Sequence, residues 1–411
     1  MGKRHLTTIA FVFALTVSTA LTSLAQTMPN GADPALWAKA LRLHRSAIII
    51  DGHNDVTGPM VDEDLNLAEN TLGRFATGGD PMHTDLNRMK KSGVTGEFFS
   101  IFVAGRDLKS AGQMRRAMDL IDATYREAER HPKNLMMCTT AAEIRRAKVL
   151  GKTCALMGIE GGYAIEDSLH ALRNFYRLGV RYMTLTWNFN TEWAETHKEE
   201  GKGKGLTDFG REIVREMNRL GMLVDISHVS SKTMSDVLDV STAPIIASHS
   251  GARGASNHTR NVPDDVLKRL PKNGGVIMIN FYPAFLDEGY NKAENDRTAR
   301  LKPEMDALRE KFKNDTAGFN EAERKLLEAN PIPLPSYTRI VDHIDHIRDV
   351  AGIDHVGLGS DFDGVPVLPA GMNGMEDLAV ITYEMLRRGY SETDVRKVLG
   401  LNFLRAFERA E

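Results

Sequence analysis

The sequence predicts an α/β fold of the (β/α)8 class, a TIM-like barrel with a charged helical insertion before the last strand. Eight short apolar runs rich in β-forming residues alternate with longer helical patterns after residue 30. This alternation indicates a parallel sheet, and eight strands specifically favour a closed barrel. Several helical stretches end in glycine, as helix C-caps do. An open doubly wound sheet is the alternative, but no G-x-G-x-x-G turn follows the first predicted strand.

The predicted strands share one feature, because each is an apolar run that finishes in polar or glycine residues. They span residues 47–51, 97–103, 154–160, 182–187, 222–228, 244–249, 275–281 and 355–361. Helical patterns lie between them, for example at 110–130, 167–179, 207–221 and 263–274. The last part of the chain, 376–409, is predicted to form two amphipathic helices that close the barrel.

One interval, about 285–337, interrupts the alternation of strands and helices. It is charged, helical in parts and rich in proline near its end. We interpret it as a surface insertion between the seventh and eighth strands, in its simplest form a helical hairpin. Its charge pattern favours a solvated face over a partner-binding arm.

The first 25 residues read as a secretory signal peptide. Lys3 and Arg4 precede an apolar stretch that ends in the small-residue pattern Ser23-Leu24-Ala25. A single N-terminal membrane anchor is the alternative, although the stretch is short and interrupted by Thr and Ser. We therefore expect a secreted or periplasmic protein with no stable membrane span after cleavage, in which residues 30–411 form one domain.

Composition narrows the classes of partner. The chain of 411 residues has a formal net charge of -3, and no basic patch interleaved with aromatic residues stands out, so no nucleic-acid partner is expected. The two cysteines, Cys138 and Cys154, are too few to staple a domain of this size. The sequence leaves open whether they pair or remain buried thiols.

Acidic residues and histidines gather at the ends of the predicted strands. In a (β/α)8 barrel the carboxyl ends of the strands meet at one mouth, where catalytic groups lie. Each of these residues alone has an ordinary interpretation as a turn, capping or core residue. Their coincidence at five strand ends favours a common cause, and the residues concerned are His53, Asp55, Glu160, His228, His249 and Asp361.

That common cause is a metal site. Three imidazoles with carboxylates and no thiolate suit Zn²⁺, and the set is large enough for two ions that share a carboxylate. Two ions roughly 3.5–4 Å apart can hold a hydroxide and polarise a carbonyl. His343 and His346 lie three apart on a predicted helix, and we favour structural or supporting roles for them. The remaining histidines are interpreted as surface, capping or supporting groups: His83, His131, His170, His197, His258 and His355.

These motifs make the chain similar to a known family. Over residues 40–407 it resembles the membrane (renal) dipeptidases, zinc metallopeptidases of the amidohydrolase-like barrel group. The motifs occur in the family's order, and they include "DGHND", "GIEGG", "GVRYMTLTWNFNTEWA", "LVDISHVS", "IASHSGAR", "RNVPDDVL", "GGVIMINF" and "GLGSDFDG".

The resemblance implies a role for each residue. His53 and Asp55 would hold one zinc ion, and His228 and His249 the other. Glu160 would bridge both ions together with a water or hydroxide. Asp361 would accept and return the proton, and Arg260 would bind the free carboxylate of a dipeptide through its planar fork of donors. The resemblance also implies tolerance of a C-terminal D-residue and a homodimer.

One position departs from the family pattern. Many members have a histidine that contacts the substrate carbonyl after the strand "YMTLT", where this chain has Trp187. An indole N–H donates a hydrogen bond but cannot titrate, so Trp187 is predicted to line the substrate site with altered specificity. The leading hypothesis is a dipeptidase. Its rivals are a related dizinc amidohydrolase acting on another amide, lactam or modified peptide, and an inactive metal-stabilised binding protein.

Overall fold

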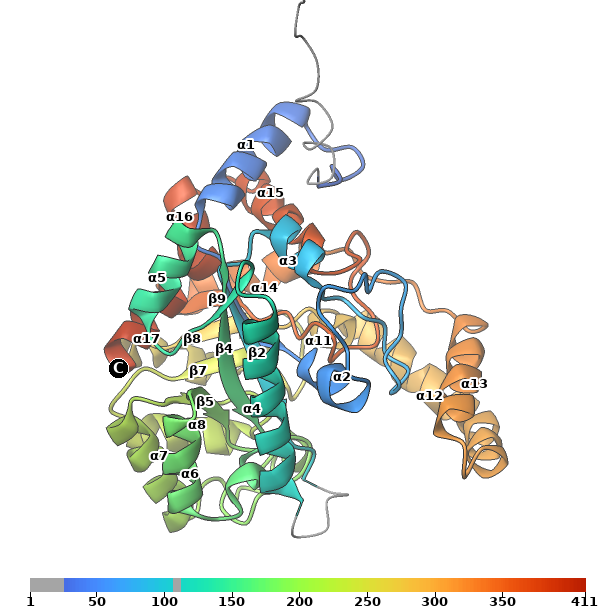
Figure 1. Cartoon of the computed structure of the whole chain (residues 1–411), viewed down its shortest axis with the longest axis horizontal. Coiled ribbons are helices and arrows are strands. Elements are labelled where there is room, and N and C mark those ends of the chain that lie inside the picture. The colour runs from blue at the N-terminus through green and yellow to red at the C-terminus, as the bar shows by residue number, and fades with distance from the viewer. Residues whose placement is uncertain (1–25, 106–111) are drawn as a thin grey trace, which may run out of the picture.

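The computed structural model of this protein describes residues 26–105 and 112–411, and the predicted signal peptide lies outside these residues (Figure 1). Nine strands form one parallel sheet. They are β1 (Ile50–Asn54), β2 (Gly96–Phe102), β3 (Leu135–Met137), β4 (Thr153–Glu160), β5 (Val180–Thr184), β6 (Leu223–Asp225), β7 (Ile246–Ser250), β8 (Val276–Ile279) and β9 (Val356–Leu358).

Eight of these strands close into a barrel. Neighbouring strands pair in the order β2-β1-β9-β8-β7-β6-β5-β4, and a long pairing of β2 with β4 completes the ring. The remaining strand, β3, lies outside the ring and pairs only with the first three residues of β4. The predicted (β/α)8 barrel is therefore confirmed, with one strand added to its rim.

Two details of the strand prediction are corrected. The first strand begins at Ile50 and runs to Asn54, so His53 belongs to the strand, whereas the prediction ended it at Asp51. The apolar run at 47–49 leads out of the preceding helix instead. The additional strand β3 was missed because Leu135–Met137 is too short to show alternation in sequence.

Helices occupy the connections between the strands. The helices up to the middle of the barrel are α1 (Pro34–Ser46), α2 (Thr57–Asp62), α3 (Leu86–Ser92), α4 (Gln113–Arg130), α5 (Ala141–Leu150), α6 (Leu169–Arg177), α7 (Asp208–Leu220) and α8 (Ser231–Val240). The later helices are α9 (Asp264–Leu267), α10 (Leu270–Asn273), α11 (Pro283–Leu286), α12 (Glu288–Lys311), α13 (Thr316–Glu328), α14 (Thr338–Ala351), α15 (Ala379–Arg387), α16 (Glu392–Arg396) and α17 (Asn402–Ala410).

The barrel interior is filled by side chains from alternating strand positions. Phe98 on β2 packs against Tyr182 on β5 and Phe403 on α17, with ring centroids 4.9 and 5.2 Å away. Each of these rings is buried. Because α17 brings Phe403 and Phe407 under the strands, the C-terminal helix closes the lower end of the barrel.

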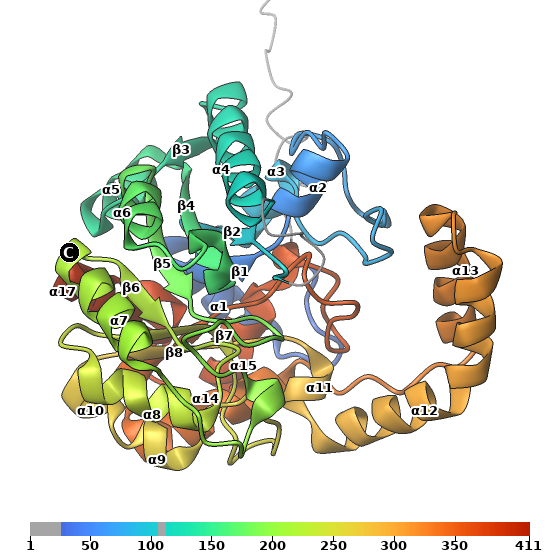
Figure 2. The ribbon, with the colours of Figure 1, turned by 90° about the horizontal axis from the view of Figure 1, so that it is seen from below.

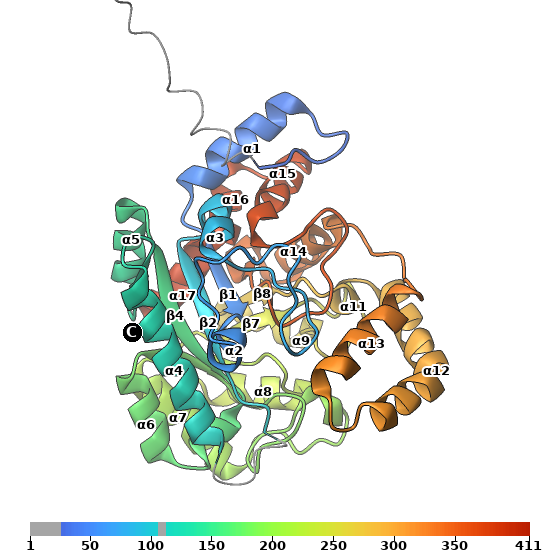
Figure 3. The ribbon, with the colours of Figure 1, turned by 45° about the vertical axis from the view of Figure 1, so that its right-hand side comes forward.

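The charged insertion projects from the barrel as helices α12 and α13 (Figures 2 and 3). Helix α13 contacts the segment after α2, where the Arg324 guanidinium stacks 5.0 Å over the Phe75 ring and Asn320 donates to the Thr77 carbonyl. Helix α12 adds Glu294 to the wall of the cavity at the barrel mouth. The insertion therefore takes part in shaping that mouth.

Cys138 and Cys154 form a disulfide between the end of β3 and the start of β4. The pairing ties the additional strand to the barrel and resolves the alternative that the sequence left open. Within residues 26–105 and 112–411, no helix combines the length and the apolar character needed to cross a membrane.

Candidate metal centre

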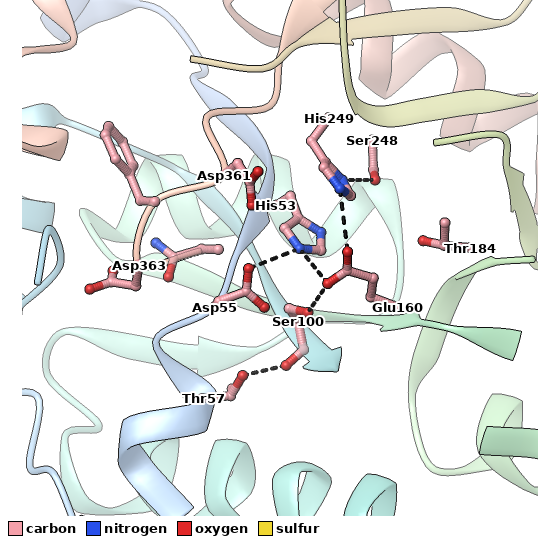
Figure 4. Close-up of polar contacts among 12 residues, drawn as sticks. His53, Asp55, Thr57, Ser100, Glu160, Thr184, Ser248, His249, Asp361 and Asp363 are labelled. Atoms are coloured by element: carbon pink, nitrogen blue, oxygen red, sulfur yellow. Dashed lines mark hydrogen bonds and ion pairs between the residues drawn. The ribbon is translucent and has the colours of Figure 1, made fainter. Parts of the chain in front are cut away.

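The structure brings the histidines and carboxylates predicted from the strand ends together at one mouth of the barrel. Figure 4 shows five of them, His53, Asp55, Glu160, His249 and Asp361. His53 and His249 lie within β1 and β7, and Glu160 is the last residue of β4. His228 and Asp361 each lie three residues beyond a strand, β6 and β9. Both adopt a φ of +64°, a left-handed conformation that non-glycine residues rarely accept.

The first group of potential ligands consists of His53, Asp55 and Glu160. Nε2 of His53 lies 3.3 Å from Oδ2 of Asp55 and 3.1 Å from Oε2 of Glu160. The other Asp55 oxygen, Oδ1, is buried and has no hydrogen-bond partner in the described part of the chain. Three donor atoms thus converge within reach of one cation.

The second group uses the other oxygen of the same glutamate. Oε1 of Glu160 lies 2.9 Å from Nε2 of His228 and 3.5 Å from Nε2 of His249. The two Nε2 atoms are themselves 2.9 Å apart. Glu160 therefore stands between two groups of ligands, one on each carboxylate oxygen.

Hydroxyl groups fix the tautomer of two of these histidines. The Tyr182 hydroxyl donates to the Gly52 carbonyl at 3.1 Å, so it accepts the Nδ1–H of His53 at 2.8 Å. The Ser248 hydroxyl donates to Asp225 at 2.6 Å and in the same way accepts the Nδ1–H of His249 at 2.8 Å. In both imidazoles Nδ1 is thus occupied by its hydroxyl partner, and Nε2 is the nitrogen that faces the mouth and is available to a cation.

Tyr182 reaches His53 because β4 has a glycine opposite it. Gly158 pairs with Tyr182 in the β4–β5 register. A Cβ at Gly158 would lie 2.0 Å from the tyrosine ring, so only glycine leaves room for the ring to cross the barrel. Sequence reasoning did not identify Tyr182 as part of the site, because its pairing with Gly158 follows from the register of β4 and β5.

The donor set fits a metal. Burial lowers the pKa of His228 to about 3, and burial together with the charge of His53 lowers that of His249 well below its ordinary value, so both rings are neutral. Nε2 of His228 and Nε2 of His249 lie 2.9 Å apart and both lie close to Oε1 of Glu160, so one cation could be bound by all three atoms. At His53, burial opposes protonation, yet the surrounding Tyr182, Asp55 and Glu160 raise the pKa well above its ordinary value. The Asp55 and Glu160 carboxylates therefore favour a positive charge next to Nε2 of His53.

Asp361 lies next to the potential metal ligands, but its side chain is hydrogen-bonded to Asn280. It forms a third potential ligand group with His53 and His249, and its Oδ2 accepts a hydrogen bond from Asn280 at 2.8 Å. Burial raises the pKa of Asp361 to about 7, and the carboxylates of Asp55 and Glu160 add to this effect. A carboxyl group with this pKa can take up and release a proton near neutral pH.

Arg260 lies in the loop after β7, and its side chain is almost fully buried. Its two Nη atoms donate to the Ser250 hydroxyl and the His249 carbonyl, both at 3.1 Å. Its Nε is buried without a partner among the described residues. Burial lowers the pKa of Arg260 to about 10, so the guanidinium remains charged at the edge of the site. The role of Arg260 in binding the substrate carboxylate, which the family resemblance implies, stays a prediction.

One cavity of about 670 Å³ opens at the barrel mouth, and its lining includes Asp55, Glu160, His228, Arg260 and Asp361. Trp187 forms part of its wall, where the indole packs edge-on against Phe102 with ring centroids 5.0 Å apart and lies 6.3 Å from the His228 ring. Asn188 and His197 also line the cavity, and His197 is buried rather than on the surface. Its Nε2 lies 3.0 Å from Asn188 Oδ1, an arrangement the sequence did not reveal.

The helical histidine pair takes no part in the centre. Nδ1 of His343 accepts the Ala252 N–H at 2.9 Å, and its Nε2 lies 3.2 Å from the Leu286 carbonyl. Nε2 of His346 lies 2.7 Å from Asp264. In the described ranges, neither residue belongs to a group able to hold a metal ion.

Paired ligand groups at the carboxyl mouth of a (β/α)8 barrel, beside a buried carboxyl and an arginine, define a metal-dependent hydrolase. Comparison with known families gives the same class in more detail. The chain belongs to the membrane dipeptidase family, peptidase family M19, whose model matches residues 37–411. It is accordingly a metallo-dipeptidase, a hydrolase acting on peptide bonds.

Solved structures share this architecture. A metallopeptidase from Rhodobacter sphaeroides, liganded with a phosphinate mimic of the dipeptide L-Ala-D-Ala, is 26% identical with a TM-score of 0.70 and covers 89% of this chain and 100% of its own. The dipeptidase AC, an M19 metallopeptidase, is 27% identical with a TM-score of 0.69 over 89% and 99%. The probable dipeptidase PvdM from Pseudomonas aeruginosa is similar in fold, at 24% identity and a TM-score of 0.77 over 92% and 99%.

Proposed function

We propose that this metallo-dipeptidase is an exported enzyme that uses two zinc ions to hydrolyse dipeptides, including those with a C-terminal D-residue. The observation that carries the proposal is Glu160, whose two carboxylate oxygens each face a separate group of ligands. His53 and Asp55 would hold one ion, and His228 and His249 the other. Imidazole and carboxylate ligands without thiolate suit zinc.

Bound ions of this kind supply a water of lowered pKa and polarise the scissile carbonyl. Side chains of the protein transfer the proton and bind the substrate. Asp361 accepts the proton that the attacking water loses and returns it to the leaving amine. Arg260 binds the C-terminal carboxylate of the substrate through its fork of N–H donors, which selects dipeptides over longer chains.

Trp187 would contribute the wall next to the scissile bond. Its indole ring lies beside His228, and no hydrogen bond of its Nε1 is found within the described chain. The indole N–H is thus free to donate to a substrate oxygen, in the position where many family members have histidine. This substitution supports a difference in substrate range.

The proposal of a D-residue rests on the Rhodobacter metallopeptidase, which carries a mimic of L-Ala-D-Ala. Export is supported by the signal-peptide pattern at residues 1–25 and by the disulfide of Cys138 with Cys154, a bond that persists in oxidising compartments. We also propose the homodimer that the family resemblance implies, which light scattering of the purified protein would test.

One observation favours a second candidate function. The cavity of about 670 Å³ falls within the range of roughly 300–1,000 Å³ that is typical of pockets for drug-sized molecules, larger than two small amino acids need. Glu294 and Asn295 of the insertion form part of its wall. A dizinc amidohydrolase acting on a modified peptide would use this additional space.

The test measures zinc content and hydrolysis of L,L and L,D dipeptides by protein beginning at Gln26, before and after chelation. We expect two zinc ions per chain. We also expect dipeptide turnover that is abolished by a chelator. Glu160→Gln should lose metal and turnover together, because it weakens both ligand groups, whereas Glu143→Gln on α5 should lose neither. Two bound ions without turnover of any dipeptide would move the assignment to the second candidate.

A further inference from the structure

A second cavity, of about 360 Å³, lies at the opposite end of the barrel from the metal centre. Its wall includes Val94 and Thr95 before β2, Asn134 before β3 and Thr153 at the start of β4. Since the strands are parallel, these amino ends face away from the catalytic mouth. Helices α1, α3 and α5, whose last residues reach this cavity, can be followed in Figure 1.

The charge of this cavity is entirely positive. Its lining contains five basic side chains and no acidic one, and these are Arg45, Lys90, Lys133, Lys148 and Lys152. Across residues 26–105 and 112–411, none of the five forms an ion pair with a carboxylate. This concentration contrasts with the net charge of -3 of the whole chain.

The negative ends of three helix dipoles offset only part of this positive charge. Arg45, Lys90 and Lys148 lie in the last turns of α1, α3 and α5, where a basic residue complements the helix dipole. Each helix end is equivalent to about half a negative charge, so three ends offset about one and a half of the five positive charges. Lys133 and Lys152 lie outside any helix. A clear positive excess therefore remains.

Lys148 shows that this charge is held in place. Its Nζ donates to the Arg45 carbonyl at 2.9 Å, which fixes the ammonium group on the cavity wall. The side chain is half-buried, and Gly151 at the rim, with a φ of +65°, leaves open space beside it. Positive groups gathered in a concave surface focus the potential and attract anions.

We propose that this cavity binds a phosphate-bearing polyanion. Lysine ammonium groups bind phosphate as point charges, and several anionic groups are needed to compensate five cations. The cavity volume lies near the lower end of the roughly 300–1,000 Å³ seen for small-molecule sites, which suits a compact ligand. The phosphates could belong to a soluble molecule or to an anionic lipid headgroup, because both present the same chemistry.

The cavity shares no residue with the metal centre, so this inference is independent of the proposed function. Its test is calorimetric titration of the zinc-loaded protein with cyclic trimetaphosphate, a polyanion that chelates metal weakly. Binding is expected, and it should weaken as salt increases. Lys148→Gln combined with Lys152→Gln should reduce the affinity about tenfold or more.

The matched control removes the same charge elsewhere. Lys268→Gln combined with Lys272→Gln changes two exposed lysines that do not line the cavity, and it should bind like the wild type. If the first double variant does not fold, Lys133→Gln replaces it, because that side chain is exposed. Absence of binding to the wild type, or equal affinity in both double variants, would overturn the proposal.

Sedimentation with vesicles distinguishes the two sources of phosphate. If phosphatidylglycerol vesicles bind the wild type, phosphatidylcholine vesicles do not, and the cavity variant loses binding, the ligand is a lipid headgroup. If trimetaphosphate binds while neither kind of vesicle does, the ligand is a soluble polyanion. Dipeptide turnover measured in the same samples should stay unchanged throughout, which separates this site from the metal centre.

Discussion

The Tyr182 hydroxyl and Nδ1 of His53 lie 2.8 Å apart in the closed interior of the barrel. This contact decides which nitrogen of His53 faces the mouth, because the hydroxyl proton is already donated to Gly52. His249 is held in the same way by Ser248. Nδ1 of His228, in contrast, is buried without a partner among the described residues. The ligand groups therefore differ in how firmly the protein orients them.

Tyr182→Phe should weaken metal binding at the group of His53 and Asp55. The variant keeps the ring that fills the barrel but removes the acceptor of the Nδ1–H, so the correct tautomer is no longer favoured. Loss of such a supporting hydrogen bond costs about 10- to 100-fold in metal affinity. Titration of the metal-free protein with zinc measures the effect.

Tyr125→Phe serves as the control for this variant. Tyr125 on α4 donates to the Leu178 carbonyl at 3.0 Å and does not line the cavity at the mouth. Its variant should bind zinc as the wild type does. If both variants show the same zinc affinity, the tyrosine contact does not orient His53.

Asp361→Asn should abolish most of the turnover while leaving zinc binding largely intact. The amide keeps the shape of the side chain and can still meet Asn280, but it cannot carry a proton. General acid–base groups contribute about 10²–10⁴-fold to the rate, and a loss of kcat in this range is expected. Steady-state kinetics and metal analysis of the same sample measure both quantities.

Asp363→Asn is the matched comparison for Asp361→Asn. Asp363 lies two residues further along and accepts the His83 N–H at 2.8 Å, a bond that an asparagine oxygen also accepts. Its kcat should fall far less than that of Asp361→Asn. A full rate for Asp361→Asn with both ions bound would remove Asp361 from the proton transfer.

Strand ends were the part of the site that the sequence could predict. His53, Glu160 and His249 occupy the ends of apolar runs, and the parallel barrel brings such ends together by its topology alone. His228 and Asp361 followed the same rule although they lie three residues beyond their strands. The barrel itself was predictable because each strand is an apolar run separated from the next by a helix.

Contacts that depend on register could not be predicted. Tyr182 supports His53 only because Gly158 lies opposite it, and nothing in a single sequence pairs these two residues. His197 was read as a surface or supporting group, since its burial beside Asn188 depends on the loop after β5. Strand β3 was missed because three residues carry too little pattern, and its position follows from pairing with β4.

Trp187→Phe should lower kcat for dipeptides by as much as about 10²-fold. Phenylalanine preserves the packing against Phe102 but removes the indole N–H, and loss of one donor to a developing oxyanion costs about 10²–10³-fold. Trp187→His should restore part of the rate, since imidazole offers a donor at this position. Kinetics on one L,L and one L,D dipeptide measure the change.

Binding and chemistry are separated in this experiment by comparing kcat with KM. A donor used in the transition state changes kcat, whereas a wall that only holds the substrate changes KM. A rise in KM at constant kcat in Trp187→Phe would make Trp187 a packing residue. If Trp187→His has the same lowered kcat as Trp187→Phe, a donor at this position does not contribute to the rate.

His44 should make the stability of the fold sensitive to acid. It lies in the last turn of α1 and is buried, with Nε2 2.8 Å from the Ser92 carbonyl and Nδ1 2.7 Å from the Thr382 hydroxyl. Burial lowers its pKa from 6.5 to about 4. Above pH 6.5 the ring is neutral in the folded and unfolded states, so it causes no pH dependence there.

Below pH 6.5 His44 is protonated in the unfolded chain but stays neutral in the folded protein, and this difference persists until the pH reaches about 4. The free energy of unfolding should therefore fall through this window by about 3 kcal/mol on account of His44.

The variant His44→Gln cannot titrate at this position, so its free energy of unfolding should fall less steeply between pH 6.5 and pH 4. It is less stable than the wild type at high pH because it loses a hydrogen bond. His170→Gln changes an exposed histidine on α6 and should retain the wild-type slope. Urea unfolding across the window measures the slopes, and equal slopes for His44→Gln and the wild type would show that this ring is not protonated on unfolding.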